Sequence, residues 1–117
     1  MASFSKLKLS GSTNGRLIKV TATSSPGTVI HTAVSGTIDY DEVWLYAMNQ
    51  GTTDTALTIE WGGTTDPDDR ITTTLLPKAG LALVVPGLVL QNENNVRAFA
   101  STANVILIGG YVNRIQA

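Results

Sequence analysis

The stretch Asp41-Glu42-Val43-Trp44-Leu45-Tyr46-Ala47-Met48-Asn49 decides the class of fold expected for this chain. Between its polar ends the side chains form two alternating apolar sets, Val43, Leu45 and Ala47 against Trp44, Tyr46 and Met48. A period of two predicts a β-strand, because successive side chains of a strand point to opposite faces. A strand that is apolar on both faces is central in its fold, or has one face against a partner.

Neighbouring segments repeat this period with one apolar and one polar side. Leu57, Ile59 and Trp61 predict a half-buried strand, whose polar outer side carries Thr58 and Glu60. Residues 28–34 also predict a strand, although their pattern does not orient it. The remaining predicted strands cover residues 16–23, with Ile18, Val20 and Ala22 toward the core, and residues 71–76, 81–85, 96–100 and 104–111.

The composition of the whole chain favours strands and no helix. Its 117 residues include 16 threonines, and turn signals such as Ser24-Ser25-Pro26-Gly27 and Pro86-Gly87 recur along it. We therefore predict an all-β, single-domain β-sandwich, jelly-roll-like, with about eight strands plus an N-terminal extended segment. Residues 1–10 form the extended segment and residues 11–117 the sandwich domain. An immunoglobulin-type sandwich without cysteines is the alternative.

Charge and cysteine content exclude several function classes. Eight basic and nine acidic residues give a net charge of -1, so we expect neither nucleic acid nor a membrane as a partner. The chain has no cysteine, which excludes thiol catalysis and thiolate metal sites. No apolar run approaches the roughly 20 residues of a membrane span, and we expect synthesis in the cytoplasm.

The titratable residues give no catalytic pattern. His31 is the single histidine, and a structural role in a strand is its expected use. A nucleophile elbow and a nucleotide-binding glycine pattern are both absent from the sequence. The acidic loop Asp66–Asp69 is either a solvated turn or a calcium site, and the turn is favoured. We expect no enzyme activity, no metal and no cofactor.

Apolar strand faces exceed what one small sandwich needs. Residues 81–90 are apolar throughout apart from a Pro-Gly pair, and Trp44, Tyr46 and Met48 form a second surplus face. Such surplus surface usually contacts protein. We predict a homo-oligomer, with a trimer favoured and a dimer possible, whose interface contains Trp44, Tyr46 and Met48. Sugar stacking is the alternative role of these aromatic rings.

The N-terminal segment is predicted as an exposed edge strand. Phe4, Lys6 and Lys8 share one side, while Leu7 and Leu9 point to the other. The segment would pair with a neighbour's sheet, or within its own sandwich.

Four stretches together resemble the capsid decoration, or cement, proteins of tailed bacteriophages. They are residues 41–49, residues 57–63, Val85-Pro86-Gly87, and Ile108-Gly109-Gly110-Tyr111-Val112-Asn113-Arg114-Ile115. The resemblance implies a β-sandwich on the capsid exterior of the virion that bridges neighbouring major capsid protein subunits without catalysis. On this hypothesis the capsid contact contains Phe4, Lys6, Leu7 and Lys8. The alternative is a receptor- or glycan-binding knob of a phage fibre or spike, using Trp44, Tyr46 or Trp61.

Overall fold

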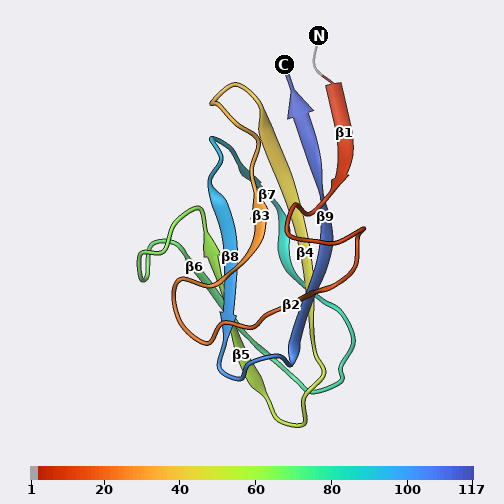
Figure 1. The fold of residues 1–117 in the computed structure, drawn as a ribbon, viewed down its shortest axis with the longest axis vertical. Coiled ribbons are helices and arrows are strands. Elements are labelled where there is room, and N and C mark those ends of the chain that lie inside the picture. The colour runs from red at the N-terminus through yellow and green to blue at the C-terminus, as the bar shows by residue number, and fades with distance from the viewer. Residues whose placement is uncertain (1–2) are drawn as a thin grey trace.

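The computed structural model describes residues 3–117, and that part of the chain holds nine β-strands and no helix (Figure 1). Two antiparallel sheets form a sandwich. Sheet A has the order β1-β9-β4-β7, with β2 also paired to β9, and sheet B has the order β3-β8-β5-β6. The strands are β1 (Ser3–Lys8), β2 (Ile18–Lys19), β3 (Thr28–Thr32), β4 (Tyr40–Asn49), β5 (Thr55–Trp61), β6 (Arg70–Leu75), β7 (Ala82–Leu90), β8 (Asn95–Ala100) and β9 (Ile106–Gln116).

The strand pairings are nested along the chain. The innermost pair is β5 with β6, followed outward by β4 with β7, β3 with β8, and β1 and β2 with β9. This nesting rolls a long antiparallel ribbon into two sheets, which is the jelly-roll arrangement. The all-β, jelly-roll-like prediction is therefore confirmed, and the immunoglobulin alternative does not describe this strand order.

The core lies between the two sheets and follows the predicted alternation. Val43, Leu45 and Ala47 of β4 are fully buried, as are Leu57 and Ile59 of β5. Strand β4 is central in sheet A, because it pairs with β9 on one side and β7 on the other. The odd-numbered residues of β4 therefore point into the interior of the sandwich, whereas the even-numbered residues of β4 face away from sheet B.

Three strands differ from the sequence prediction in extent. The strand predicted over residues 16–23 is reduced to β2, because only Ile18 and Lys19 pair with β9 and the chain then crosses to sheet B, where the Ala22 carbonyl accepts from the Ala100 amide. The Pro86-Gly87 pair was expected to end a strand, but β7 continues through it from Ala82 to Leu90. Two irregularities in the β4–β7 register accommodate the pair, and β7 is an edge strand, where proline costs no ladder hydrogen bond. Strand β9 extends to Gln116, beyond the predicted residue 111, because β1 and β4 flank its final residues.

The polar outer side predicted for β5 is also different, because it is not solvated. Glu60 is fully buried and Thr58 is nearly so. The loop before β3 covers Glu60, whose carboxylate accepts hydrogen bonds from the Ser25 hydroxyl at 2.5 Å and the Gly27 amide at 2.7 Å. A period-two pattern assigns a side chain to a face, but it does not show that a distant loop closes over that face.

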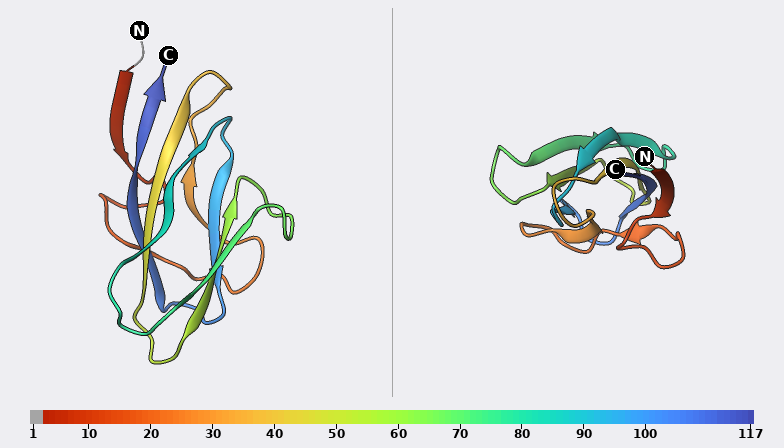
Figure 2. Two further views of the ribbon diagram at one scale, coloured as in Figure 1. Left: turned by 180° about the vertical axis from the view of Figure 1, so that it is seen from behind. Right: turned by 90° about the horizontal axis from the view of Figure 1, so that it is seen from above.

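The molecule is elongated, with principal extents of 49 × 27 × 21 Å. Strands β1 and β9 run side by side to one end of the molecule (Figures 1 and 2). Among the described residues 3–117, no helix is long and apolar enough to cross a membrane.

Candidate functional site

The outer face of sheet A is the side that points away from sheet B. Antiparallel partners directly opposite each other project to the same side, so the register defines its members. They are Phe4, Lys6 and Lys8 of β1, Lys19 of β2, Tyr40, Glu42, Trp44, Tyr46 and Met48 of β4, Leu83, Pro86 and Val89 of β7, and Leu107, Tyr111, Asn113 and Ile115 of β9.

A row of interacting side chains crosses the middle of this face. The ring centroids of Trp44 and Tyr111 are 6.4 Å apart with an interplanar angle of 17°. The ammonium group of Lys6 lies 4.3 Å from the Tyr111 ring centroid. On the other side Trp44 covers Gly87, where an added Cβ would lie 2.8 Å from the indole. The row is therefore preorganised, with each ring held between neighbours from adjacent strands.

Glu42 fixes the orientation of the indole. Its Oε1 accepts hydrogen bonds from Trp44 Nε1 at 2.7 Å and from Asn113 Nδ2 at 3.1 Å. These two bonds lower the pKa of Glu42 below its ordinary value, because they favour the ionised carboxylate. The charge of Glu42 is thus used within the chain to hold Trp44 flat against its neighbours.

Close approach of the backbone supports the same row from beneath. Gly110 pairs with Leu45 in the register, and an added Cβ at Gly110 would lie 2.0 Å from the carbonyl oxygen of Trp44. Only glycine fits there, because any side chain would collide with the β4 backbone. This contact lets β9 approach β4 and brings Tyr111 beside Trp44.

The β4 and β7 side of the face is apolar, and we call Trp44, Tyr46, Met48, Leu83 and Val89 the apolar half. The three β4 members are the residues predicted at an oligomer interface, and none of them contributes to the core. Leu83 and Val89 are exposed by 49% and 54%. The structure thus places the predicted interface residues together on an uncovered surface of the described chain.

The predicted capsid-contact residues lie on β1 and divide between its two sides. Phe4, Lys6 and Lys8 point outward, and Phe4 is 76% exposed. Leu7 points inward and packs against the core. Strand β1 pairs with β9 of its own chain, so the segment belongs to sheet A. The outward residues therefore share one face with the apolar half.

Lys19 and Tyr111 complete the face but were absent from the predicted site. Strands β1 and β2 pair with successive parts of β9, which brings Lys19 in line with Lys6 and Lys8. The three exposed lysines form a row that we call the lysine edge. The sequence indicated that Lys19 lies on the polar side of its strand, but it contained no signal that β2 continues the edge begun by β1.

A second polar cluster lies inside the sandwich around His31. The imidazole Nε2 is 2.7 Å from Asp41 Oδ2, and Nδ1 accepts a hydrogen bond from the Ser10 amide at 3.0 Å. Arg114 donates from Nε and a terminal nitrogen to Asp41 at 2.8 and 3.1 Å. His31 and Asp41 are 1% and 0% exposed. A sandwich interior tolerates these groups because each has a partner.

This cluster contains serine, histidine and aspartate, but it lacks the contact that activates a nucleophile. The Ser10 hydroxyl accepts the Thr32 amide at 2.7 Å, and the backbone of Ser10, rather than its hydroxyl, binds the imidazole. Nucleophilic catalysis needs the hydroxyl beside the base. The arrangement is that of a structural histidine, which was the expected use of His31.

The pKa of Asp41 reflects two opposed effects. Burial of the carboxylate raises its pKa, whereas hydrogen bonds from Arg114 and His31, together with their charges, lower it, and the net direction is downward. Asp41 therefore stays ionised beneath the outer face. It joins β4 to β9 through Arg114 and sheet A to sheet B through His31.

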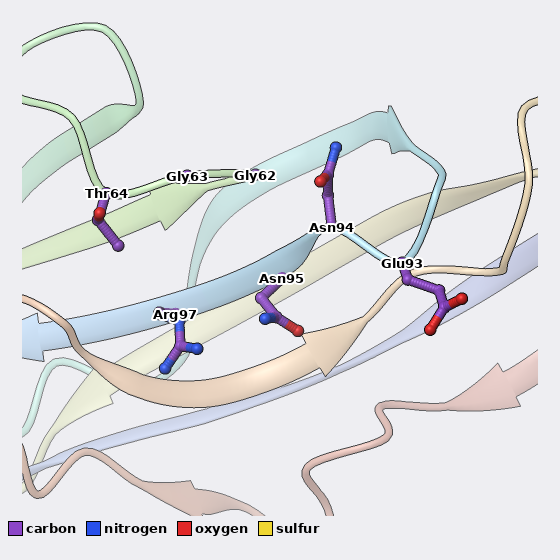
Figure 3. Close-up of a pocket in the computed structure, with 7 residues that line it drawn as sticks. All are labelled: Gly62, Gly63, Thr64, Glu93, Asn94, Asn95 and Arg97. Carbon is purple, nitrogen blue, oxygen red and sulfur yellow. The ribbon is translucent and has the colours of Figure 1, made fainter.

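A hollow of about 230 Å³ lies between the β5–β6 and β7–β8 loops and is lined partly by Arg97, Asn94 and Asn95. In Figure 3 the polar ends of Arg97 and Asn95 lie on one side of β8, whereas Asn94 and Glu93 point in other directions. Arg97 donates to the Gly27 carbonyl at 3.3 Å, and Asn95 accepts from the Thr32 hydroxyl at 2.8 Å. The polar groups do not converge on one position, so the hollow offers no site for directed chemistry.

The acidic loop is organised by its own contacts. Asp69 accepts the Thr65 amide at 3.0 Å, and Asp66 lies 3.5 Å from Arg70. Within residues 3–117, the structure brings together no group of three or more histidine, aspartate or glutamate side chains that would hold a metal ion.

Comparison of the chain with protein-family models, with curated proteins and with solved structures finds no match.

Proposed function

We propose that this protein is a non-enzymatic structural component of a tailed-bacteriophage virion, and that it binds the capsid exterior and bridges major capsid subunits. The observation that carries the proposal is the outer face of sheet A. It is rich in aromatic and aliphatic side chains and is not covered by the described residues, although the core of the fold is already filled. Contiguous apolar surface of this kind marks protein contacts. The partner follows from the resemblance to decoration proteins.

The two sides of the face suit two contacts. The β1 side, with Phe4, Lys6 and Lys8 above Leu7, would contact the capsid. The apolar half, with Trp44, Tyr46 and Met48, would contact a second copy in a homo-oligomer, with a trimer favoured and a dimer possible. These contacts lie side by side on one sheet, so an oligomer would present several β1 strands toward neighbouring capsid subunits.

The proposed effect on the capsid is mechanical. A protein that binds assembled subunits but not separated ones shifts the equilibrium toward assembly by mass action. No reacting group is required, which is consistent with the engaged His31 and with the polar groups that do not converge in the hollow beside Arg97. The protein would be made in the host cytoplasm and act on the outside of the head.

Co-sedimentation with empty heads of the encoding phage tests the proposal directly. We expect saturable binding to heads and none to unassembled capsid subunits at the same protein concentration. A folded sample that fails to bind heads would contradict the capsid role. Binding to a glycan array by that sample would instead favour a receptor- or glycan-binding knob, in which the paired Trp44 and Tyr111 rings stack on sugar.

Sedimentation velocity of Trp44→Ala tests the oligomer contact. We expect a lower solution mass for this variant with an unchanged far-ultraviolet circular dichroism spectrum. Phe99→Ala is the matched control, because Phe99 is a partly buried aromatic residue on the outer face of sheet B. Equal masses for Trp44→Ala and the unmodified protein would remove Trp44 from the interface.

A further inference from the structure

We infer that the lysine edge, Lys6, Lys8 and Lys19, recognises a protein surface rich in carboxylates on the assembled shell. This inference rests on the proposed capsid role and specifies the chemistry of the partner. Its basis is the distribution of charge over the molecule, which the near-neutral total conceals.

Charge on the outer face of sheet A is unbalanced. The face carries three lysines against one carboxylate, Glu42, which is already hydrogen bonded to Trp44 and Asn113. The remaining carboxylates lie elsewhere in the described chain: Asp39 before β4, Asp41 in the interior, Glu60 under a loop of sheet B, and Asp54, Asp66, Asp68, Asp69 and Glu93 in connecting loops. The free charge of the face is therefore positive.

The lysines flank the aromatic row instead of standing apart from it. Lys8 is opposite Tyr111, which is opposite Trp44, and Lys19 is opposite Leu107, which is opposite Met48. A partner seated on the rings would lie within reach of the ammonium groups, whose attraction grows as water is excluded. Three cations on a chain of net charge -1 are few for a phosphate backbone, so an acidic protein surface fits better.

Salt and charge reversal test this inference on intact heads. Between 50 and 500 mM sodium chloride we expect affinity for heads to fall by about tenfold or more, because exposed charge pairs are screened. Lys8→Glu should weaken binding by about tenfold at low salt. Lys78→Glu, a charge reversal at an exposed lysine in the loop after β6, should leave binding unchanged.

The possible results separate the inference from the proposed function. Saturable binding that ignores both salt and Lys8→Glu would overturn the role of the lysine edge while preserving the capsid role. Absence of binding by the folded protein at every salt concentration would contradict the capsid role itself. An equal loss in Lys8→Glu and Lys78→Glu would mean that net charge, and not the lysine edge, controls binding.

A separate observation supports a second inference: the geometry points to His31 as an acid-sensitive latch for residues 9–12, the segment that follows β1. The Ser10 amide donates to His31 Nδ1, so Nδ1 carries no proton and Nε2 donates to Asp41. A second proton would bind Nδ1, and the resulting Nδ1–H would point at the N–H of Ser10, so that two donors would face each other. Protonation therefore breaks the Ser10 contact, while it adds charge to the Asp41 contact.

The surroundings of the ring allow this exchange. The charged groups that face it are Asp41 on β4 and Arg114 on β9, while β8 presents the apolar Val96 opposite His31. His31 borders a surface hollow lined also by Ser10 and Ser12. Lys8 borders the same hollow, but its register places it on the outer face of sheet A. Asp41 remains a partner in both protonation states, so the change stays local.

The segment keeps other attachments when the latch opens. Thr32 donates its amide to the Ser10 hydroxyl, and the Gly11 amide donates to the Ile30 carbonyl at 3.0 Å. We therefore expect loosening of residues 9–12 without unfolding when the ring gains a proton at Nδ1.

Amide hydrogen exchange at Ser10, followed by NMR together with the imidazole signals, tests the latch. Between a pH above and a pH below the proton uptake that the imidazole signals report, we expect protection at Ser10, corrected for the intrinsic exchange rate, to fall by about tenfold or more. Protection at Val43 in β4 should not change. Unchanged Ser10 protection, or an imidazole that gains no proton before the protein unfolds, would overturn the inference without affecting the capsid proposal.

Two substitutions separate the ring's two hydrogen bonds. His31→Asn offers an oxygen near the position of Nδ1, so Ser10 should stay protected at both pH values. His31→Gln offers an amide nitrogen near the position of Nε2 and loses the acceptor, so Ser10 should exchange rapidly at both. If either variant fails to fold, the titration of the unmodified protein still decides the question.

Discussion

The outer faces of the two sheets differ in how their side chains are satisfied. On sheet B, Glu60 lies under the loop before β3, and the Arg70 guanidinium lies 5.2 Å from the Phe99 ring centroid. On sheet A, the outer face exposes Phe4, Tyr40, Leu83 and Val89, whereas Val29 is the one large exposed hydrophobic in the described strands of sheet B. The contrast shows that a loop of the chain covers part of the outer face of sheet B, whereas the described residues leave the outer face of sheet A uncovered.

The two sides of sheet A should differ most in their contribution to folding. Asp41→Asn weakens the contacts to Arg114 and His31 beneath the outer face, and breaking a buried ion pair costs about 3 kcal/mol or more. Glu42→Gln, one residue away and facing outward, should cost clearly less. Urea unfolding of both variants at pH 7 provides the measurement, and equal losses would contradict the division between the inner and outer sides.

Acid should affect the unmodified protein and the Asp41→Asn variant differently. The pKa of Asp41 in the folded protein is lowered, so its stabilising contribution is present above the unfolded value of about 3.9 and is lost as the pH falls through the folded pKa. The unfolding temperature of the unmodified protein should therefore drop below about pH 4, and Asp41→Asn should show a shallower drop. A parallel pH dependence in both proteins would exclude Asp41 as its source.

The buried carboxylate of sheet B, Glu60, should make the next largest contribution to stability. Glu60→Ala leaves the Gly27 amide without its partner in a buried position and removes the contact to Ser25, a loss of about 2 to 3 kcal/mol. Binding of the folded variant to heads should be unchanged, because Glu60 lies on the opposite side of the molecule from the lysine edge. Loss of head binding by a folded Glu60→Ala protein would show that sheet B also contributes to recognition.

Inserted charge should have the smallest effect on stability and the clearest effect on association. Thr72→Lys on the exposed side of sheet B should change the unfolding free energy by less than about 0.5 kcal/mol and leave the solution mass unaltered. Met48→Lys should lower the solution mass measured by sedimentation velocity, because it places a charge in the apolar half. Equal masses for the two variants would remove the functional contrast between the faces.

The local alternation of apolar and polar residues was sufficient to predict the architecture of most of the chain. Alternation in residues 41–49 and 57–61 correctly oriented the core sides of β4 and β5, and the absence of helical periodicity was correct for all described residues. Pro86-Gly87 was misinterpreted because the same residues that end a strand are also tolerated in an edge strand with an irregular register. Whether a strand is at an edge depends on its neighbours, which local sequence does not specify.

The candidate site was predictable only in part, for the same reason. Trp44, Tyr46 and Met48 were recognised because their apolar side is surplus within one strand. The positions of Tyr111 and Lys19 on this face depend on pairing between segments that are distant in the sequence. The stacking of Lys6 on Tyr111 depends on such a pairing too, because β1 and β9 are separated by about one hundred residues. Similarly, His31 was identified as structural, but its partners Ser10, Asp41 and Arg114 come from three other parts of the chain.

The sequence by itself determined that this protein is an all-β sandwich with more apolar strand surface than its core requires. That follows from side-chain alternation, which depends on neighbouring residues alone. The tertiary structure decided which surplus face stays open, which carboxylates are enclosed, and that three lysines flank one aromatic row. These outcomes depend on strand order and register, since pairing sets which distant side chains lie opposite each other and which are covered by a loop.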